Sequence, residues 1–389
     1  MRNGWPLSVS RLTLTDFRCY RCQRIETDPR PVVLTGSNGA GKTNLLEALS
    51  FLVPGQGLRR ARLDEVARRE SGFADGAGKR RPWAVAVRVN TPDGEIDIGT
   101  GCEAISNNVV MNRRIVHVDG QVRKSQAVLS ELLSVYWLTP YMDRLFTDSS
   151  ASRRRFVDRL VFGFDPAHAG RVSAYNHALR ERARLLRHGR ADPEWLAALE
   201  DTMARKGIAV AAARRETVSR LDNICSKETG PFPGAGLAVT GDIENWLDEG
   251  PALEAEDRLR AALAKARRTD MESGGAGPGA HRSDLVVRHL AKECPADQCS
   301  TGEQKALLIA VVLANTRLQA AERGKIPILL LDEVAAHLDI RRREALFSEI
   351  MALGSQAWLT GADAGLFSSI YGKAQFFNIE DGVVTPTIR

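Results

Sequence analysis

A glycine-rich stretch at residues 36–44 constrains the fold of this chain more than any other part of its sequence. The stretch fits the pattern G-x-x-x-x-G-K-[ST]. The fixed positions of this pattern are occupied by Gly36, Gly41, Lys42 and Thr43. An apolar, β-branched run at 31–34 precedes the stretch as a buried strand would, and residues 44–52 follow it as a helix. The succession of strand, glycine loop and helix predicts an α/β fold, with an ordinary glycine turn as the alternative.

A loop of this kind points backbone N–H groups at an anion and adds the positive end of a helix dipole, which together suit a triphosphate. In this pattern Lys42 reaches the β- and γ-phosphates, and the hydroxyl of Thr43 binds Mg²⁺. The sequence therefore predicts ATP and Mg²⁺ as cofactors. The residues predicted to bind ATP are Gly36, Ser37, Asn38, Gly39, Ala40, Gly41, Lys42, Thr43 and Asn44.

An apolar run at residues 326–331 ends in two acidic residues, Asp332 and Glu333. Buried parallel strands have this composition, and acids at the carboxyl end of such a strand face the ligand crevice. Asp332 is predicted to join Thr43 as a Mg²⁺ ligand, and Glu333 to orient and deprotonate the attacking water. Two acids also follow apolar strands by chance, but the glycine loop upstream favours a catalytic pair of Glu333 and Lys42.

Length and composition limit the class of protein. A chain of 389 residues is long for one core, so two or three lobes are expected. The net charge of +6 favours a polyanionic partner, although many basic proteins bind no nucleic acid. The longest apolar run, 306–314, is too short to span a membrane, and no apolar segment typical of a secretory signal follows Met1. A cytoplasmic protein without a membrane partner is expected.

The six cysteines do not form a recognisable metal motif. Cys19 and Cys22 make a C-x-x-C, and Cys294 and Cys299 lie close together much later in the chain. A zinc site needs four ligands at suitable spacing, and no second C-x-x-C is present. We therefore expect free thiols and no metal at the cysteines.

The periodicity changes along the chain and suggests three parts. An alternating strand at 8–17 and antiparallel strands within 83–122, with a hairpin turn at Asp119 and Gly120, indicate a β lobe beside the glycine loop. From about 150 to 270 the period is helical, and a glycine-rich linker follows at 271–279. We predict an N-terminal half of the head at 1–149, a helical arm lobe at 150–278 and a C-terminal half of the head at 279–389.

Three basic segments have two interpretations each. The loop 54–62 either contacts phosphate or is simply solvated. The arginines of the second predicted helix, and the run 153–155, either contact nucleic acid or form a solvated face. The arginines considered in that helix and in the segment that follows it are Arg180, Arg182, Arg184, Arg187 and Arg190.

Residues 300–304 open a helix that then becomes apolar, and in isolation they indicate a capped core helix. Their position between the glycine loop and the two acids changes the interpretation. The stretch resembles the signature motif of ABC-type ATPases, in which one subunit contacts the γ-phosphate held by the other. The predicted signature residues are Ser300, Thr301, Gly302, Glu303 and Gln304. Asp339, just beyond Glu333, resembles the D-loop aspartate of that class.

The long insertion between the two motifs points to the SMC-like branch of these ATPases, and within it the chain resembles the RecF family. The segments that carry the resemblance are 12–18, 36–43, 138–140, 153–158, 279–285, 300–304 and 331–339. The resemblance implies an ABC-type P-loop ATPase head with an antiparallel β lobe and an inserted, mainly helical arm lobe. Two departures are noted: no glutamine follows Thr139 and Pro140, and Thr360 or Asp363 replaces the switch histidine.

The resemblance also implies an activity and partners. Proteins of this family act in DNA replication, repair and the SOS response, bind single- and double-stranded DNA at gaps, and dimerise head to head with ATP. Their hydrolysis is weak and stimulated by DNA, and with RecO and RecR they favour RecA loading. Three alternatives remain: a non-hydrolytic ATP-gated DNA clamp, the ATPase subunit of an ABC transporter, and a P-loop small-molecule kinase, in which 300–304 would have no role.

Overall fold

The computed structural model describes residues 7–68, 82–102, 113–187, 192–227 and 230–388. Its contacts divide the chain into two compact units. The first contains the chain up to residue 142 together with the chain from 316 onward, and the second contains 143–315. The boundaries predicted after residues 149 and 278 both fall inside the second unit. Arg190 and the stretch 103–112 of the predicted β lobe lie outside the described residues.

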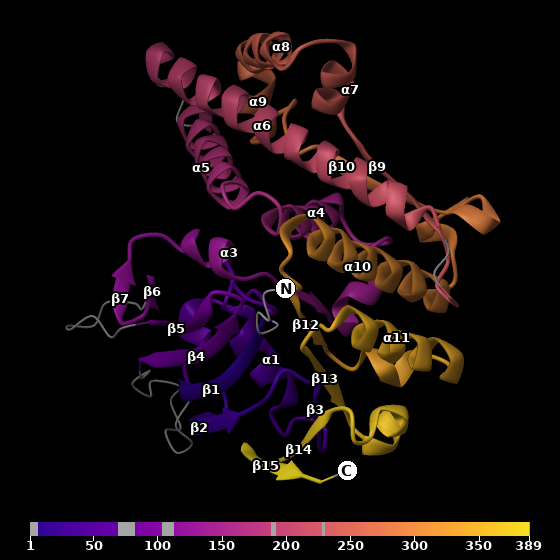
Figure 1. Ribbon diagram of the computed structural model, residues 1–389. Helices are drawn as coiled ribbons and strands as arrows, with labels where there is room; N and C mark the ends of the chain where they lie inside the picture. Colours follow the sequence, from indigo (N-terminus) through magenta and orange to yellow (C-terminus); the bar gives the residue numbers. More distant parts are fainter. Residues whose placement is uncertain (1–6, 69–81, 103–112, 188–191, 228–229, 389) are drawn as a thin grey trace. The chain divides into compact units, whose positions relative to one another are not determined.

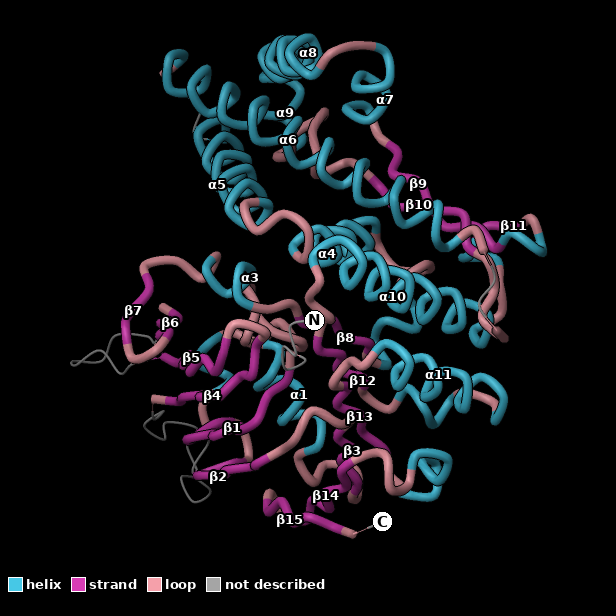
Figure 2. Tube along the Cα trace, in the orientation of Figure 1, coloured by secondary structure: helices cyan, strands magenta, loops and turns pink. Residues whose placement is uncertain are grey.

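The first unit contains a six-stranded sheet in the order β15-β14-β3-β13-β12-β8 (Figure 1; β8 is labelled in Figure 2). Its strands are β3 (Val32–Thr35), β8 (Val135–Leu138), β12 (Ile328–Leu331), β13 (Ala357–Gly361), β14 (Gln375–Glu380) and β15 (Val383–Thr387). All neighbours pair in parallel except β14 with β15. Every residue of β3 and β12 is buried, as their uninterrupted apolar sequences predict for strands covered on both faces.

A second sheet of the first unit is antiparallel, in the order β2-β1-β4-β5-β6-β7. Its strands are β1 (Ser8–Phe17), β2 (Tyr20–Glu26), β4 (Trp83–Thr91), β5 (Gly94–Cys102), β6 (Arg114–Val118) and β7 (Gln121–Arg123). The predicted hairpin turn is confirmed, because Asp119 and Gly120 have φ angles of 50° and 76°. Strand β2 was not predicted, since its sequence is mostly polar and only two of its seven residues are buried.

Helix α1 (Lys42–Ser50) belongs to the same apolar core as both sheets. Its leucines are fully buried, and each contributes roughly 1.5–3 kcal/mol by leaving water. Directly after the helix, Phe51 packs 5.2 Å from the ring of Trp83 on β4. The other helical segments of this unit are α2 (Leu63–Val66), α3 (Val128–Leu132), η4 (Val334–His337), α11 (Ile340–Leu353) and η5 (Ala364–Ile370). The core therefore fixes the helix that begins at the glycine loop.

The second unit is mainly helical, as predicted, and also contains a three-stranded sheet (Figure 2). Its helices are α4 (Ser150–Phe162), α5 (His168–Arg187), α6 (Pro193–Cys225), α7 (Asp242–Glu249), α8 (Ala252–Lys265) and α9 (Arg267–Ser273). Its strands are β9 (Ala235–Thr240), β10 (Asp284–His289) and β11 (Cys294–Pro295), in the order β11-β10-β9. The sequence placed the β10 segment in the nucleotide-binding lobe, but β10 pairs with β9, which was not predicted. Two helical segments cross the boundary between the units, η1 (Pro140–Arg144) and α10 (Thr301–Arg323).

The arginines of α5 do not form one solvated face. Arg182 is fully buried and donates hydrogen bonds to Glu200, Asp270 and the Leu263 carbonyl oxygen. Asp270 also accepts a hydrogen bond from the Gly277 backbone N, which holds part of the predicted flexible linker against α9. The interpretation of this helix as a uniformly solvated or DNA-contacting face is therefore wrong at Arg182.

Two of the three arginines in the run 153–155, Arg153 and Arg154, are also structural. Arg153 makes two hydrogen bonds of 2.7 Å to the Asp284 carboxylate, and Arg154 donates to the Ser283 carbonyl oxygen. Both contacts connect α4 to the β10 segment inside the second unit. These side chains are engaged within the fold, and neither a solvated face nor a nucleic-acid contact is needed to explain them.

Candidate nucleotide-binding site

The glycine loop connects β3 to α1 in a conformation that other residues rarely adopt. Gly36 and Gly41 have φ angles of 141° and 120°. A Cβ atom at Gly36 would lie 2.2 Å from the carbonyl oxygen of Ile379, and one at Gly41 would lie 2.6 Å from the hydroxyl of Tyr20. Backbone conformation and space therefore both require glycine at these two fixed positions. The central residues of the loop, Ser37, Asn38 and Gly39, are exposed.

The side chain of Lys42 folds back over this loop. Its Nζ donates hydrogen bonds to the carbonyl oxygens of Gly36 at 2.7 Å and Ser37 at 2.9 Å. Burial lowers the pKa of Lys42, and the negative charges of Glu333 and Asp332 oppose that shift. The ammonium group thus lies against the glycine loop and within electrostatic reach of both acids.

Strand order brings the remaining predicted residues of the first unit to the same place. In the order β3-β13-β12, parallel neighbours end at one edge of the sheet, so the residues that follow them meet there. The hydroxyl of Thr43 donates a hydrogen bond of 2.9 Å to Asp332 Oδ1, and the hydroxyl of Thr360 donates one of 2.8 Å to the same atom. Burial raises the pKa of Asp332, and the two hydroxyl donors partly oppose this.

Glu333 is held in a left-handed conformation, with φ of 52°. Its backbone N donates a hydrogen bond of 2.9 Å to the Thr360 hydroxyl oxygen, and its side chain is half-buried. Thr360, one of the two residues considered for the switch position, therefore contacts both acids at once, and this contact is what the sequence did not reveal. The signal available was one threonine after the buried residues Trp358 and Leu359, at the end of a parallel strand next to β12.

The sequence also missed the residues that support the glycine loop from behind. The fully buried carboxylate of Glu47 on α1 accepts two hydrogen bonds from Arg18, at 2.8 and 2.6 Å. The hydroxyl of Tyr20 donates to the carbonyl oxygen of Gly41, and Arg59 donates to the side chain of Asn44. Arg59 lies in the basic loop 54–62, so in this structure that loop contacts the first turn of α1.

The predicted signature residues lie in the second unit, at the start of α10. Ser300, Thr301 and Gly302 are exposed, Glu303 is half-buried and Gln304 is buried. The carboxylate of Glu303 pairs with Lys292 and accepts a hydrogen bond from the Ser300 backbone N at 3.0 Å, which together hold the pKa of Glu303 near 2. Gln304 Nε2 donates to the Cys299 carbonyl oxygen at 2.8 Å. The backbone of Ser300 and the side chain of Gln304 are thus held by hydrogen bonds, while Ser300, Thr301 and Gly302 are exposed.

Two further predicted residues begin helices of the first unit. Asp339 is exposed, and its carboxylate accepts a hydrogen bond from the Arg342 backbone N at the start of α11. Asp363 accepts one from the Gly365 backbone N at the start of η5. Of the two residues considered for the switch position, Thr360 contacts the acids, whereas the carboxylate of Asp363 caps its own turn.

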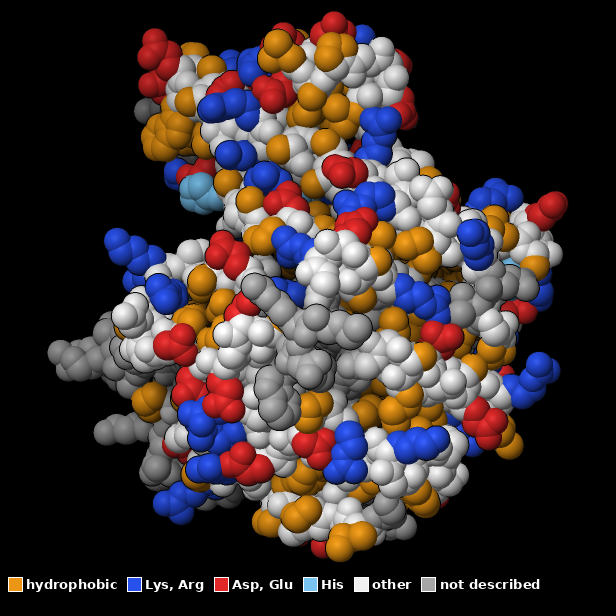
Figure 3. Space-filling view, in the orientation of Figure 1, with side chains coloured by type: hydrophobic (Ala, Val, Ile, Leu, Met, Phe, Trp, Pro, Cys, Tyr) orange, Lys and Arg blue, Asp and Glu red, His pale blue; other side chains and the backbone are white. Residues whose placement is uncertain are grey.

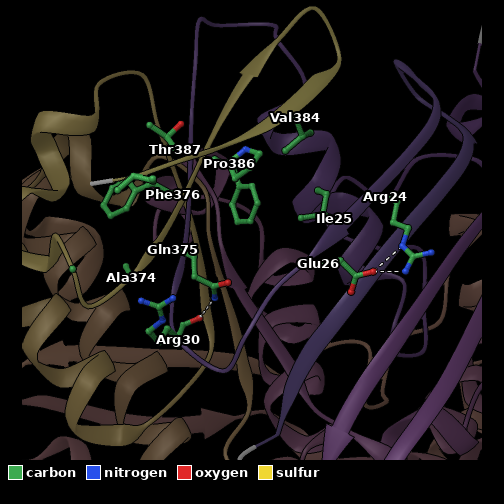
Figure 4. A pocket seen from close by; sticks show the side chains of 13 residues that line it. Arg24, Ile25, Glu26, Arg30, Ala374, Gln375, Phe376, Val384, Pro386 and Thr387 are labelled. Carbon is green, nitrogen blue, oxygen red and sulfur yellow. Dashed lines mark hydrogen bonds and ion pairs between the residues drawn. The ribbon is translucent and has the colours of Figure 1, made fainter.

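A separate hollow of about 490 Å³ lies in the first unit, at the edges of the two sheets (Figure 4). It is lined by side chains of β2, β14 and β15, among them the ion pair of Arg24 and Glu26. None of the predicted nucleotide-binding residues lines this hollow. Among the described residues, no helix is both long and apolar enough to cross a membrane, and no cluster of three or more metal-binding side chains is present.

The fold and this arrangement define a class. A mainly parallel sheet with a glycine loop on one strand and paired acids on another, an antiparallel sheet and a long helical insertion together form the ABC-type P-loop ATPase head. A family model for the RecF/RecN/SMC N terminal domain matches residues 8–383. The chain belongs to this RecF/RecN/SMC family.

Relatives agree over nearly the full length. The "DNA replication and repair protein RecF" of Mesorhizobium japonicum is 49% identical over 381 residues, covering 97% of this chain and 98% of the relative. The protein of the same name from Agrobacterium fabrum is 48% identical over 381 residues, with the same coverage. The predicted resemblance to the RecF family is confirmed.

Solved structures agree in fold. The recombination mediator protein RecF–ATPrS of the RecFOR pathway gives a TM-score of 0.84 at 20% identity, covering 99% of this chain and all of the other. RecF–ATP gives 0.79 at 21% identity, covering 98% of this chain and all of the other. The Smc head domain derived from Pyrococcus furiosus gives a TM-score of 0.55 at 16% identity, covering 98% of this chain and 96% of the other. The predicted α/β ATPase-head fold is confirmed.

Proposed function

We propose that this chain is an ATP-dependent DNA-binding ATPase of DNA replication and recombinational repair. The observation that carries the proposal is the hydrogen-bonded set of Thr43, Asp332, Glu333 and Thr360, formed where three parallel strands end, with Lys42 folded over the adjoining glycine loop. The relatives named DNA replication and repair protein RecF support the biological process. ATP is the proposed nucleotide, bound by 36–44.

The oxygen ligands present fit Mg²⁺. The Thr43 hydroxyl and the Asp332 carboxylate are hard oxygen donors 2.9 Å apart at the edge of the glycine loop, as a magnesium site shared with a nucleotide requires. When bound there, Mg²⁺ would neutralise charge on the β- and γ-phosphates. Lys42 adds a positive charge to the same phosphates. Glu333 accepts the proton of the attacking water. The hydrogen bond from its backbone N to Thr360 holds Glu333 in place.

The active form in this proposal is a homodimer. One chain offers one glycine loop and one signature segment, so a composite site needs two chains. Exposed Ser300, Thr301 and Gly302 at the start of α10 contact the γ-phosphate held by the partner, and exposed Asp339 contributes the D-loop contact. In this functional division the head consists of 1–149 and 279–389, and 150–278 form the arm.

ATP controls how long the protein stays on DNA. Binding closes the dimer, and weak, DNA-stimulated hydrolysis opens it on single- or double-stranded DNA at gaps. RecO- and RecR-type mediators are the proposed protein partners. RecA loading and the SOS response are the proposed biological context, and the cytoplasm is the proposed location.

The net charge of +6 supports a polyanionic partner, although basic and acidic side chains are interspersed on the face shown in Figure 3. DNA affinity should fall steeply with salt, because arginine and lysine contacts to phosphate release counterions.

A complementation experiment tests the composite site. Lys42→Ala and Ser300→Arg each leave a homodimer with no intact site. A mixed dimer of the two variants combines the intact glycine loop of one chain with the intact signature segment of the other, so one of its two sites is complete. Mixing should therefore restore ATP-dependent dimerisation and part of the DNA-stimulated turnover.

The outcomes separate the competing functions. Absence of complementation, with both variants folded, would contradict the composite site. Restored dimerisation without turnover would favour a non-hydrolytic ATP-gated DNA clamp. A transporter ATPase subunit predicts that turnover responds to a membrane partner and not to gapped duplex DNA.

A further inference from the structure

Two cysteines lie in contact immediately before the signature segment. The Sγ atoms of Cys294 and Cys299 are 3.4 Å apart, whereas a disulfide requires about 2.05 Å. The segment between them turns back on itself through η3 (Ala296–Gln298), and the Cys299 backbone N donates a hydrogen bond to the Ala296 carbonyl oxygen. All six cysteines of the chain lie among the described residues, and none of them forms a disulfide.

The two thiols differ in their surroundings. Cys294 is half-buried, whereas Cys299 is buried. Burial and the contact with Cys294 raise the pKa of Cys299, so its thiolate forms less readily than that of an ordinary cysteine. An oxidant therefore meets Cys294 first, and Cys299 is placed behind it as the resolving thiol, which is the arrangement of a redox-sensitive pair.

We propose that Cys294 and Cys299 are a modification site, at which hydrogen peroxide oxidises the two thiols to a reversible disulfide that weakens ATP-dependent dimerisation through the signature segment. The Cys294 thiolate attacks the peroxide, forming an S–O bond and releasing hydroxide, which is protonated to water. The Cys299 sulfur then attacks the Cys294 sulfur, and the sulfenic oxygen leaves as a second water with the Cys299 proton. The two thiols lose two electrons and the peroxide gains them.

The contacts of Cys299 explain why the disulfide acts on its neighbours. Its carbonyl oxygen accepts the hydrogen bond from Gln304 Nε2, and its own thiol is directed at the Pro295 carbonyl oxygen at 3.6 Å. The next residue, Ser300, is tied through its backbone N to Glu303. Moving the Cys299 sulfur toward Cys294 removes the thiol contact and shifts the peptide that orients Ser300 and Gln304. Loss of one such hydrogen bond corresponds to roughly a tenfold weaker interaction.

Peptide mass mapping tests the disulfide on the full chain. The protein is treated with hydrogen peroxide, the remaining thiols are alkylated, and trypsin releases the peptide 293–305, which contains both cysteines. We expect this peptide to be unalkylated and lighter by two hydrogen masses, and to regain both thiols with dithiothreitol. Recovery of the peptide with two alkylated cysteines, or with stable sulfinic acid at Cys294, would overturn the proposal.

A second measurement tests the consequence, which rests on the proposed function. Sedimentation in ATP compares reduced and oxidised protein, and we expect dimerisation to weaken about tenfold on oxidation and to recover with dithiothreitol. Cys294→Ser and Cys299→Ser are the matched variants, since each retains the exposed thiols of Cys19 and Cys22. Both should dimerise equally well before and after peroxide. Equal losses in wild type and variants would overturn the coupling to dimerisation. If reduced wild type fails to dimerise with ATP, the proposed function fails, and peptide mapping still decides the disulfide.

Discussion

Thr43 and Asp332 lie 289 positions apart in the sequence and are joined by a hydrogen bond of 2.9 Å. Thr43 belongs to the first turn of α1, and Asp332 follows β12. Strand β13 lies between β3 and β12 and places Thr360 against the same carboxylate. The oxygen atoms proposed to bind Mg²⁺ are therefore held together by the protein itself, which reduces the ordering that nucleotide binding must supply.

Replacing Thr360 with valine should slow hydrolysis more than it weakens ATP binding. Valine keeps the shape but removes the donor to Asp332 and the acceptor for the Glu333 backbone N. Two hydrogen bonds at a buried site correspond to a fall in kcat of about 10–100-fold. Steady-state kinetics give kcat and KM, and Thr385→Val on exposed β15 is the control. A fall in ATP affinity as large as the fall in kcat would argue against a positioning role.

Lys42→Ala should lose most of its nucleotide affinity. A charged hydrogen bond to phosphate contributes about 1.5–3 kcal/mol, which corresponds to a loss of roughly 10–150-fold in Kd for ATP. Calorimetric titration with ATP measures the loss, and Lys373→Ala, at an exposed lysine of the same unit, should bind normally. ATP affinity retained by Lys42→Ala would count heavily against the assigned site.

Glu333→Gln should bind ATP and accumulate as a dimer. The amide has nearly the shape of the carboxylate but cannot accept the proton of the attacking water, so removal of a general base lowers turnover by about 10²–10⁴-fold. Because ATP persists, the closed form should dominate in sedimentation with ATP and Mg²⁺, while the wild type returns to monomer as ATP is consumed. A variant that remains monomeric with ATP would contradict the assignment of Glu333.

The sequence predicted the elements whose pattern is local. The buried strands β3 and β12 are uninterrupted apolar runs, and the turn at Asp119 and Gly120 has a strong local preference for positive φ. The glycine loop and the two acids could be paired because each follows such a strand. Local signals thus accounted for the parallel core and for the composition of the candidate site.

The remainder depends on contacts between distant segments. In the sequence, Arg182 does not differ from the other arginines of a basic helix. In the fold its side chain is buried because it forms ion pairs with acidic residues of α6 and α9. Thr360 lies next to Asp332 because β13 stands beside β12 in the sheet, and the periodicity of the sequence does not predict this order of strands. The sequence likewise did not predict the pairing of β10 with β9. These two short strands of six residues each are separated in the sequence by three helices, so no local turn pattern connects them.

The core of the second unit contains a buried charge cluster around Asp158 on α4. Its carboxylate accepts two hydrogen bonds from Arg214 on α6, at 2.7 and 2.8 Å, and contacts His168 on α5 at 2.8 Å. Arg154, on the same helix, adds a further positive charge nearby. Burial disfavours the ionised carboxylate, but the charge of Arg214 and the hydrogen bonds from His168 and Arg214 outweigh it and lower the pKa of Asp158.

Acid should therefore destabilise this unit through Asp158. Because the folded pKa lies below the unfolded value of about 3.9, the unfolded chain binds the proton first, and this contribution to stability is lost as pH falls from about 4 through the folded pKa. Hydrogen exchange of α4 and α6 amides should show that loss in the wild type. Asp158→Asn should lack this acid dependence and be less stable by about 3–5 kcal/mol at neutral pH, because the Arg214 charge stays buried without its partner. An equal acid response in both proteins would assign the effect to other carboxylates.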